Sequence, residues 1–595
     1  MIIKTVMKIL TGFRIFWRRW LAILLFFITV IVLTSYNPVN LKTQDSQLVV
    51  SYLTDPKTFN PALVVELTHI LPYTYEGLVK ENAQGKLEPC IAESWKFSKD
   101  YKKIVFLIRK GLNWSDGVPL TADDVVFTYN EIYKNPAIPS YAKDFLKMGK
   151  NRAFPTVRKL DDFRVEFTLP EPWFPFLRIT KMEILPAHAL REAVNTKNEE
   201  GQPKFLSTWG TDTAPEKIIV NGPYKIETYQ PGERIIFRKN PYYWRKDLQG
   251  NRQPYIDRVI WNTVKNTDTA LLQFRSGGLD FIDVHPDYFS LLKQEEKRGK
   301  FTIYNNGPSL GSTVIAFNLN KGSRNGKPLI DPIKSRWFNT LEFRQAVAYG
   351  IDRQQILNNV YRGLGELQNS PLSVNSPYYL SEKAGLKVYE YNPQKAKELL
   401  LKAGFQYTKV GQLLDEQGNP VRFTLITDAS NKVLQAMAVQ VKQDLARIGI
   451  SVDFNPVSLS LFLEKINFAF DWECTVLTTI VGIEPNEWAN IWLPSGRWHF
   501  FNQQSPSAER SIMGREVAKW EQKIGDLYIQ AAGEFDEEKR KALYGETQRI
   551  SQNYLPFIYL VNPLSMLAVR NRIQGVKPSP YVGTYWNIYE MKLKE

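Results

Sequence analysis

The stretch from Ala92 to Tyr129 carries the most regular structural signals in the chain. Within it, Lys103–Arg109 is a run of β-branched and aromatic residues between charged residues, which predicts a strand. Ser115-Asp116-Gly117 then provides the side-chain acceptor and the glycine of a tight turn. Thr121 is a natural helix N-cap, and Asp124 follows three residues later in a near capping box. A strand, a tight turn and a capped helix in direct succession favour a fold that mixes both kinds of element.

Strand and helix signals continue to alternate along the chain. Asp268 is predicted to cap a helix that ends at Gly277-Gly278. Asp352 and Asn392 are predicted to cap two later helices. Further strands are predicted at Gln47–Leu53, Arg164–Leu169, Arg234–Arg238, Asp280–Val284, Thr313–Asn320 and Cys474–Ile480. This alternation predicts α/β layers rather than a β-sandwich.

The size and charge of the chain limit what it can be. With 595 residues it is too long for one ordinary domain, because single cores stop growing at roughly 250 to 300 residues. Two or three domains are therefore expected. The net charge of +15 arises from basic residues that are interleaved with acidic ones and form no block typical of nucleic-acid arms. We expect this charge to favour solubility, and we expect no nucleic-acid partner.

The N-terminal segment, residues 1–40, predicts targeting. A basic stretch, Arg14–Arg19, precedes the uncharged apolar run Leu21–Leu33. The run has the length of the hydrophobic region of a signal peptide and is shorter than the ~20 residues that span a bilayer comfortably. Because no clean cleavage site follows, an uncleaved anchor is the alternative. Either interpretation places the bulk of the chain outside the cytoplasmic membrane, in the periplasm or at the cell surface.

Signals for catalysis and for cofactors are weak. We find no nucleophile elbow, phosphate-binding loop or dinucleotide fingerprint. Cys90 and Cys474 form no metal or redox motif, and they are either a disulfide or buried free thiols. The four histidines are scattered, without the spacing of metal ligands. We therefore expect neither a cofactor nor a metal site, although two distant carboxylates of a secreted hydrolase would escape sequence reasoning.

A binding cleft needs aromatic and apolar walls with a few orienting polar groups. The segment Asp471–Trp492 fits this description best: a strand, a glycine turn, then Glu484-Pro485 with Trp488 and Trp492 beyond. The alternative interpretation of the two tryptophans is packing into a core at i,i+4 spacing.

Three motifs carry a resemblance to a known family. They are A-E-S-W followed by W-S-D-G-x-P-L-T-A-x-D-V near Trp95–Val126, N-G-P-Y and N-P-x-Y-W within Asn221–Trp244, and FRQAVAYGIDRQQI at Phe343–Ile356. Together they resemble the extracellular solute-binding proteins of ABC importers, family 5, the peptide/nickel class. The resemblance covers roughly Gln47–Lys594.

The resemblance implies an α/β, two-lobed periplasmic-binding-protein fold (class II, cluster C type) with a small extra domain inserted in the first lobe. The implied boundaries are 45–75 with 205–305 and 569–595 for lobe I, 76–204 for the inserted domain, and 306–568 for lobe II. The strand at Thr313–Asn320 resembles the one that crosses to the second lobe, where a hinge would lie. Closure around a ligand would be recognised by a membrane permease.

The resemblance also implies candidate ligand-binding residues, namely Phe59, Asn318, Thr478, Thr479, Val481, Glu484 and Trp488. Family peptide binders carry, four residues before the proline, an aspartate that pairs with the peptide ammonium. Here that position is Val481, and a buried ammonium without a counter-charge costs several kcal/mol, on the order given for unpaired charges. Glu484, Glu473 and Asp471 are possible substitutes.

The resulting prediction is a monomeric, non-enzymatic receptor that delivers a small peptide-like solute to ABC permease and ATPase subunits. The N-terminal segment is expected to contact the membrane. Two alternatives remain: an anchored sensor or chaperone-like receptor on the same fold, and a secreted hydrolase.

Overall fold

The computed structural model describes residues 46–63, 71–479, 481–505 and 510–594. The chain divides between Leu48 and Val49, and the unit from Val49 onward contains nearly all of the described elements. The predicted signal peptide or anchor lies outside the described residues. In the part of the chain that is described, no helix combines the length and apolar character needed to cross a bilayer.

The stretch that dominates the sequence folds as predicted. The Thr121 side chain accepts a hydrogen bond from the Asp123 amide (3.3 Å), and the Thr121 amide donates to Asp124 Oδ2 (2.9 Å), which confirms the capping box. The elements are β4 (Ala92–Phe97), β5 (Lys103–Ile108), α4 (Ala122–Phe127) and the π-helical turn η1 (Thr128–Tyr133). With β6 (Thr156–Asp161) and β7 (Arg164–Thr168), they form an antiparallel sheet in the order β4-β5-β7-β6. Around this sheet lie β2 (Val79–Glu81), β3 (Leu87–Pro89), α5 (Ala142–Phe145), α6 (Phe176–Ile179) and α7 (Ala187–Asn195).

Two further sheets consist mainly of strands from the ranges predicted for lobe I, whereas their strand β23 lies mostly in the range predicted for lobe II. One has the order β1-β10-β9-β8, and the other has the order β11-β23-β12. Their strands are β1 (Gln47–Tyr52), β8 (Tyr224–Gln230), β9 (Arg234–Lys239), β10 (Arg258–Thr263), β11 (Phe281–Asp283), β12 (Phe301–Pro308) and β23 (Val561–Arg570). The helices are α3 (Leu71–Thr74), α8 (Thr267–Arg275) and α9 (Pro286–Glu295). The predicted cap of α8 is wrong: Asn266, not Asp268, accepts from the Thr269 amide (2.9 Å), because the helix starts two residues earlier than expected.

A five-stranded sheet organises the region predicted as lobe II. Its order is β20-β19-β21-β13-β22, with β19 parallel to both β20 and β21 and the other pairs antiparallel. The strands are β13 (Ser312–Phe317), β19 (Arg422–Asp428), β20 (Ser451–Val457), β21 (Cys474–Thr479) and β22 (Phe557–Tyr559). The helices are α10 (Pro332–Asn339), α11 (Leu341–Gly350), α12 (Arg353–Asn359), α13 (Pro393–Lys402), α14 (Lys432–Arg447) and α15 (Leu459–Glu464). Asp352 and Asn392 cap α12 and α13 as predicted.

Buried arginines explain the motif at Phe343–Ile356 in structural terms. Arg344 donates to the carbonyl of Tyr554 (3.0 and 2.9 Å), and Arg353 donates to that of Tyr559 (2.6 Å). Each guanidinium therefore ties a helix of lobe II to a distant part of the chain. The motif acts through packing and buried hydrogen bonds.

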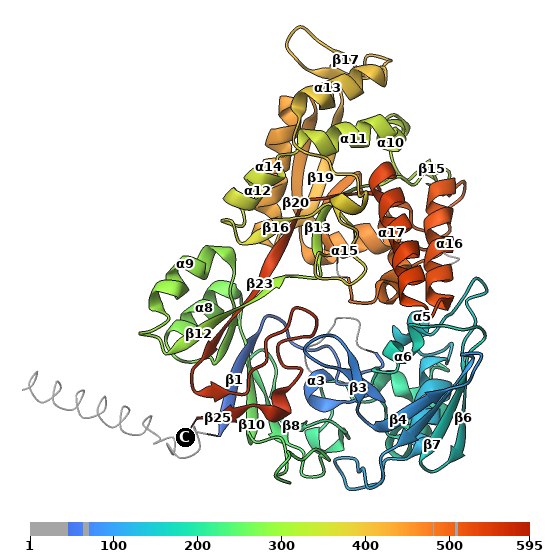
Figure 1. Cartoon of the computed structure of the whole chain (residues 1–595), viewed down its shortest axis with the longest axis vertical. Helices are drawn as coiled ribbons and strands as arrows, with labels where there is room; N and C mark the ends of the chain where they lie inside the picture. The colour runs from blue at the N-terminus through green and yellow to red at the C-terminus, as the bar shows by residue number, and fades with distance from the viewer. Residues whose placement is uncertain (1–45, 64–70, 480, 506–509, 595) are drawn as a thin grey trace, which may run out of the picture. The chain divides into compact units, whose positions relative to one another are not determined.

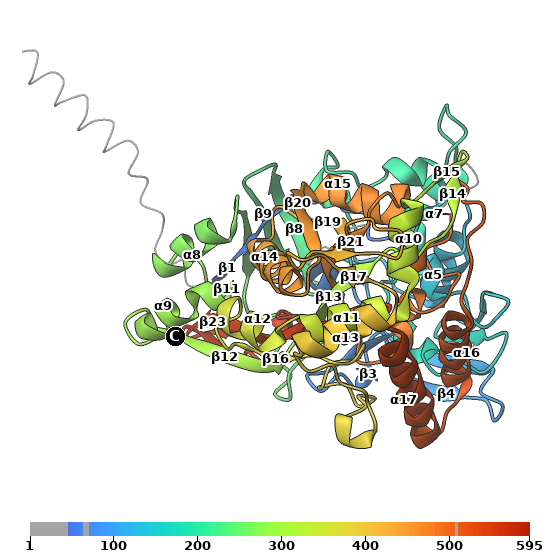
Figure 2. The ribbon, with the colours of Figure 1, turned by 90° about the horizontal axis from the view of Figure 1, so that it is seen from above.

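Two long helices, α16 (Lys519–Gly533) and α17 (Glu537–Tyr554), form a hairpin beside this sheet (Figures 1 and 2). The end of α16 and the connection contact the region predicted as the inserted domain. Phe535 stacks on Tyr101 with ring centroids 3.9 Å apart, and the Phe174 amide donates to the Ala532 carbonyl (2.7 Å).

The chain passes between the sheets at two places. β12 is followed within a few residues by β13, and β22 is followed directly by β23. The first part of β23 pairs with β16 (Gly365–Leu367), whereas its later part pairs with β11 and β12. Figure 1 shows β23 running between the two regions. The predicted crossover strand is thus β13, and its hinge role stays a prediction.

Both cysteines are buried and free. Burial raises the pKa of the Cys90 thiol to about 12, so it stays protonated. Of the two alternatives for the cysteines, the free buried thiols are the one observed.

Candidate functional site

The candidate site is the turn that follows β21. This strand lies in the interior of the five-stranded sheet, between β19 and β13. After it, Val481–Glu484 leads into a short 3-10 helix, η6 (Pro485–Ile491). Pro485 starts this helix, because a proline is tolerated where no backbone donor is needed. The sheet therefore holds the turn from one side and η6 holds it from the other.

Three predicted residues lie at the end of β21. Thr478 is exposed, whereas Thr479 is buried and its hydroxyl donates to the Ser312 carbonyl (3.2 Å). Val481 is 9% exposed and packs in the core of lobe II. Of the three, only Thr478 presents itself to solvent.

Glu484 is buried within a polar cluster. Its Oε1 accepts from the Tyr544 hydroxyl (2.8 Å), and its Oε2 accepts from Arg540 Nη2 (3.2 Å) and from the Tyr378 hydroxyl (3.4 Å). Burial raises the pKa of Glu484 to about 7, although the Tyr544 hydrogen bond acts in the opposite direction. The carboxylate is already surrounded by donors and is closed off from a ligand.

Arg540 connects this cluster to the inserted-domain region. Its guanidinium carbon lies 3.3 Å from the centre of the Phe174 ring. Burial lowers the pKa of Arg540 to about 10, which leaves it charged at neutral pH. A buried cation on an aromatic face forms a strong contact between the two regions.

Trp488 lies half-buried against the core of lobe II. Its ring is tilted against that of Trp498, with centroids 5.4 Å apart. Trp492 is buried and stacks on Tyr528 (6.1 Å). Core packing therefore accounts for Trp492, while Trp488 keeps one accessible side at the turn.

The other two predicted residues lie elsewhere. Asn318 follows the far end of β13, where its side chain donates to the carbonyls of Phe470 and Trp472 (3.0 and 3.1 Å). The antiparallel register sets Ser312 opposite Thr479, so Asn318 lies about 20 Å from the turn at ~3.3 Å per residue. Phe59 lies in the loop after β1, buried edge-on against Tyr229 (5.2 Å). The structure does not bring these two residues to the turn.

An ion pair that sequence reasoning missed spans the site. Lys181 Nζ lies 2.7 Å from Glu487 Oε1 and 3.3 Å from Glu81 Oε2. Arg178 also pairs with Glu81 and donates to the Gly85 carbonyl (3.0 Å). Burial lowers the pKa of Lys181, but the two carboxylates outweigh it and raise the pKa overall, so the ammonium stays charged.

Glu487 also folds back over the turn. A Cβ added at Gly482 would lie 2.0 Å from Glu487 Oε2 and 3.4 Å from Trp488 Nε1. The carboxylate therefore rests on the bare backbone beside Val481. Glu487 stood within the segment chosen from sequence, but nothing in the sequence links it to Lys181, 306 residues away.

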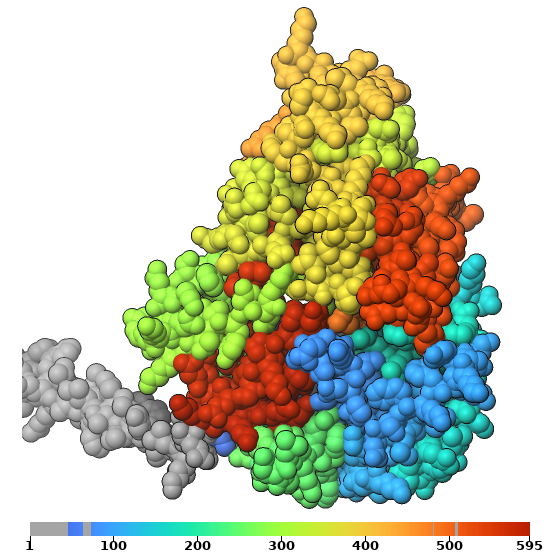
Figure 3. Space-filling model, viewed as in Figure 1, coloured from blue at the N-terminus to red at the C-terminus, as the bar shows by residue number. Residues whose placement is uncertain are grey.

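The last part of the chain completes the contact between regions. The Ser579 hydroxyl donates to the Ala83 carbonyl (2.7 Å), and the Tyr581 hydroxyl donates to the Asn375 carbonyl (3.2 Å). Figure 3 shows this C-terminal segment against the residues that follow β1. It touches both sides of the site.

Metal and acid–base chemistry find little support here. Among the described residues, no three metal-ligating side chains gather into a possible metal site. His499 is buried between the Ile491 carbonyl (2.9 Å) and Glu521 (3.1 Å), which is a structural arrangement. The charged and aromatic groups at the turn instead suit the binding of a polar solute.

Comparison with known proteins gives three similarities. A family model described as bacterial extracellular solute-binding proteins, family 5 Middle, matches residues 86–493. A probable ABC transporter-binding protein of Deinococcus radiodurans is 28% identical over 562 residues, 89% of each chain. The oligopeptide-binding protein AppA of Bacillus subtilis is 26% identical over 551 residues, 90% of each chain.

The solved structure of the same Bacillus subtilis protein, in complex with a nonapeptide, resembles this fold with a TM-score of 0.73 and 25% identity. The match covers 92% of this chain and 99% of that one. The similarity therefore extends over whole molecules rather than one shared domain.

Proposed function

The chain belongs to the bacterial extracellular solute-binding proteins of family 5, and from this premise we propose that it binds a peptide-like solute with a free amino group at the turn Val481–Glu487. The predicted family and the predicted two-lobed periplasmic-binding fold are confirmed. The protein is a solute-binding receptor of an ABC importer and not an enzyme.

The observation that carries the proposal is the pair formed by Lys181 and Glu487 (2.7 Å). A lysine ammonium and the α-ammonium of a peptide present the same chemistry to a carboxylate. Because Glu487 rests on Gly482, its carboxylate lies beside Val481, where family peptide binders carry an aspartate. We propose that Glu487 supplies the missing charge and that Lys181 occupies its place when no ligand is bound.

The other carboxylates of the segment are engaged elsewhere. Glu473 pairs with Lys334 (2.7 Å), and Asp471 pairs with Lys465 (2.8 Å). Glu484 is enclosed by its own donors. Of these carboxylates, only Glu487 combines a partly exposed cationic partner with a position over the turn.

The exchange is energetically reasonable. The Lys181 side chain is 38% exposed whereas Glu487 is 12% exposed, so the pair is partly buried and Glu487 needs a new cationic partner when Lys181 leaves. Lys181 retains Glu81 as a partner after Glu487 is released (3.3 Å). The ligand ammonium therefore replaces one ion pair by another without leaving a charge unpaired.

The test compares peptides with free and acetylated amino termini by calorimetry. Glu487→Gln is expected to weaken binding of the free peptides about tenfold and to leave acetylated ones unchanged, since only the ammonium needs the carboxylate. Lys181→Met is expected to strengthen binding of the free peptides. Glu516→Gln, at an exposed carboxylate paired with Lys321, is the matched control.

Equal affinity of Glu487→Gln and the unchanged protein for free peptides would contradict the role of Glu487. Absence of binding to any peptide would contradict a peptide-like solute. Delivery to a membrane permease, a monomeric state and attachment through the N-terminal segment are parts of the same proposal. A membrane fractionation of the full chain with and without residues 1–40 tests the attachment.

A further inference from the structure

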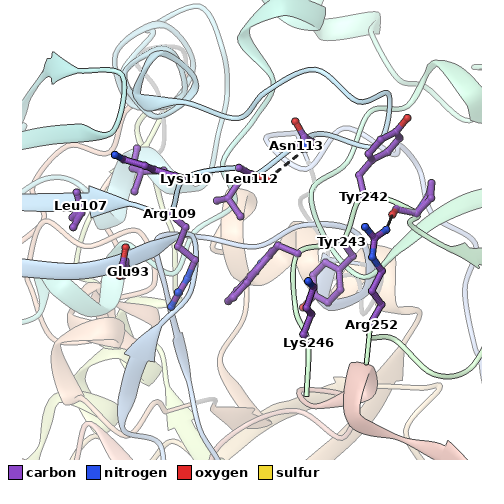
Figure 4. A pocket seen from close by; sticks show the side chains of 14 residues that line it. Glu93, Leu107, Arg109, Lys110, Leu112, Asn113, Tyr242, Tyr243, Lys246 and Arg252 are labelled. Carbon is purple, nitrogen blue, oxygen red and sulfur yellow. Dashed lines mark hydrogen bonds between the residues drawn. The ribbon is translucent and has the colours of Figure 1, made fainter. Parts of the chain in front are cut away.

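A cavity of about 610 Å³ is lined by residues that lie outside the turn Val481–Glu487. One side is formed by β4, β5 and the turn after β5, from Glu93 to Asn113; the other is formed by the loop Pro241–Arg252 (Figure 4). Its volume falls within the range of small-molecule sites. The peptide site proposed above uses none of these residues.

The cavity is lined by four cations and one carboxylate. The cations are Arg109, Lys110, Lys246 and Arg252, and the carboxylate is Glu93. None of the four cations forms an ion pair with another described residue. This is unlike the neighbouring Arg245, which pairs with Glu76. An excess of unpaired positive charge in a concave surface attracts anions.

One wall of the cavity is rigid. The Trp244 indole N–H donates to Glu76 Oε2 (2.8 Å), which fixes the ring. Arg109 and Arg245 lie over this ring, with guanidinium carbons 4.5 and 4.2 Å from its centre. Arg109 Nε also donates to the Cys90 carbonyl (2.7 Å). The guanidinium of Arg109 is therefore held in place before any ligand arrives, while its terminal nitrogens keep their donors.

The cations are separated into two groups. Figure 4 shows Arg109 and Lys110 on one side of the cavity and Lys246 and Arg252 on the other, near Tyr242. A ligand with negative groups at two ends would reach both.

We propose that this cavity binds a small polyanion that carries two phosphate groups. Arginine suits this ligand, because its planar donors match phosphate oxygens, and lysine adds point charges. Glu93, the one carboxylate of the lining, lies on the Arg109 side and lowers the net positive charge there. The phosphates come either from a soluble compound or from anionic lipid headgroups, which share this chemistry.

The test measures binding of inorganic pyrophosphate to the full chain by calorimetry at low ionic strength. Lys246→Gln with Arg252→Gln removes two exposed cations and is expected to weaken binding about tenfold. Arg298→Gln with Lys432→Gln removes the same charge at exposed positions outside the cavity and is the control. The control is expected to change the affinity less than about twofold.

A second variant tests the fixed guanidinium. Arg109→Lys keeps the charge but loses the planar donors, and it is expected to weaken pyrophosphate binding severalfold, by about threefold or more. Inorganic phosphate is expected to bind at least about tenfold more weakly than pyrophosphate, because it carries one phosphate group and less negative charge.

Equal losses in the cavity variant and in the control would overturn the proposal, and so would equal affinity for phosphate and pyrophosphate. Flotation with phosphatidylcholine vesicles, with and without phosphatidylglycerol, identifies the source. Capture by the anionic vesicles that the cavity variant loses supports the lipid source. Absence of binding to both pyrophosphate and vesicles contradicts the site. Peptide binding by the cavity variant stays unchanged, so the two proposals fail independently.

Discussion

Glu484 and Glu487 stand three residues apart, yet their surroundings differ in kind. Glu484 is 3% exposed and accepts hydrogen bonds from Tyr544, Arg540 and Tyr378. Glu487 has one lysine partner, which belongs to another region of the chain. The comparison teaches that the Glu484 side chain, through its buried hydrogen bonds, holds the fold together, whereas the Glu487 carboxylate is available for exchange.

The contacts between regions follow the same division. Around Glu484, the regions meet through Arg540 on the Phe174 ring and through Phe535 on Tyr101. Around Glu487, they meet through the ion pairs of Lys181, whose side chain is 38% exposed. Separation of the regions is therefore expected to be easier at Glu487 than at Glu484.

The largest expected effect comes from breaking the buried cluster. Glu484→Gln replaces an acceptor oxygen by donors that face Arg540 and Tyr544, so we expect the free energy of unfolding to fall by about 3 kcal/mol. Urea denaturation followed by circular dichroism measures it. Glu487→Gln is the matched substitution, with an expected loss of about 0.5 kcal/mol. Equal losses of unfolding free energy in Glu484→Gln and Glu487→Gln would contradict the conclusion that only Glu484 holds the fold together.

A smaller effect concerns pH. Because burial raises the pKa of Glu484 to about 7 from about 4.3 in unfolded chains, the folded state binds the extra proton between these values. Stability is therefore highest below the unfolded pKa and is lost as the pH rises through the folded pKa of about 7. Denaturation at a series of pH values measures this slope. In Glu484→Gln the dependence of stability on pH is expected to flatten. An unchanged dependence would mean that other titrating groups cause it.

The substitution Gly482→Ala is expected to displace the carboxylate of Glu487 and to leave Glu484 in place. The added Cβ would lie 2.0 Å from Glu487 Oε2, so the carboxylate must move, while the loss of unfolded-state entropy keeps the stability within about 0.5 kcal/mol. We expect affinity for free-amino peptides to fall about threefold, since the carboxylate leaves the turn. Gly583→Ala, where a Cβ meets nothing within 4 Å, is the control. Unchanged affinity in Gly482→Ala would show that the ligand does not bind at the turn.

The sequence allowed the local parts of this molecule to be predicted. The capping box at Thr121 and Asp124 depends on residues three apart, and its geometry leaves few alternatives. The prediction of the α8 cap was wrong because Asn266 and Asp268 are both good N-cap residues, and local chemistry alone does not rank them.

The site was predicted only in part, for a physical reason. The segment that holds Val481 and Glu484 could be located from its glycine, proline and tryptophans. The direction of each side chain could not, because it depends on partners such as Arg540 and Lys181 from distant parts of the sequence. Asn318 shows the same limit: its strand was located correctly, but the antiparallel register puts its side chain at the opposite end from the turn.

The smallest expected effect is optical. Trp488 Nε1 lies at the turn, 3.4 Å from where a Gly482 Cβ would stand, and its ring contacts Trp498. A ligand that displaces Lys181 from Glu487 changes the polarity beside this indole, so peptide binding should shift its emission. Trp488→Phe is expected to remove most of that shift, although the protein has 15 tryptophans and total emission changes little. Trp520→Phe, at a ring stacked on Tyr554 (5.3 Å), is the control and should keep the shift. If Trp520→Phe loses the shift and Trp488→Phe keeps it, the ligand lies away from the turn, and Glu487 has no role in its capture.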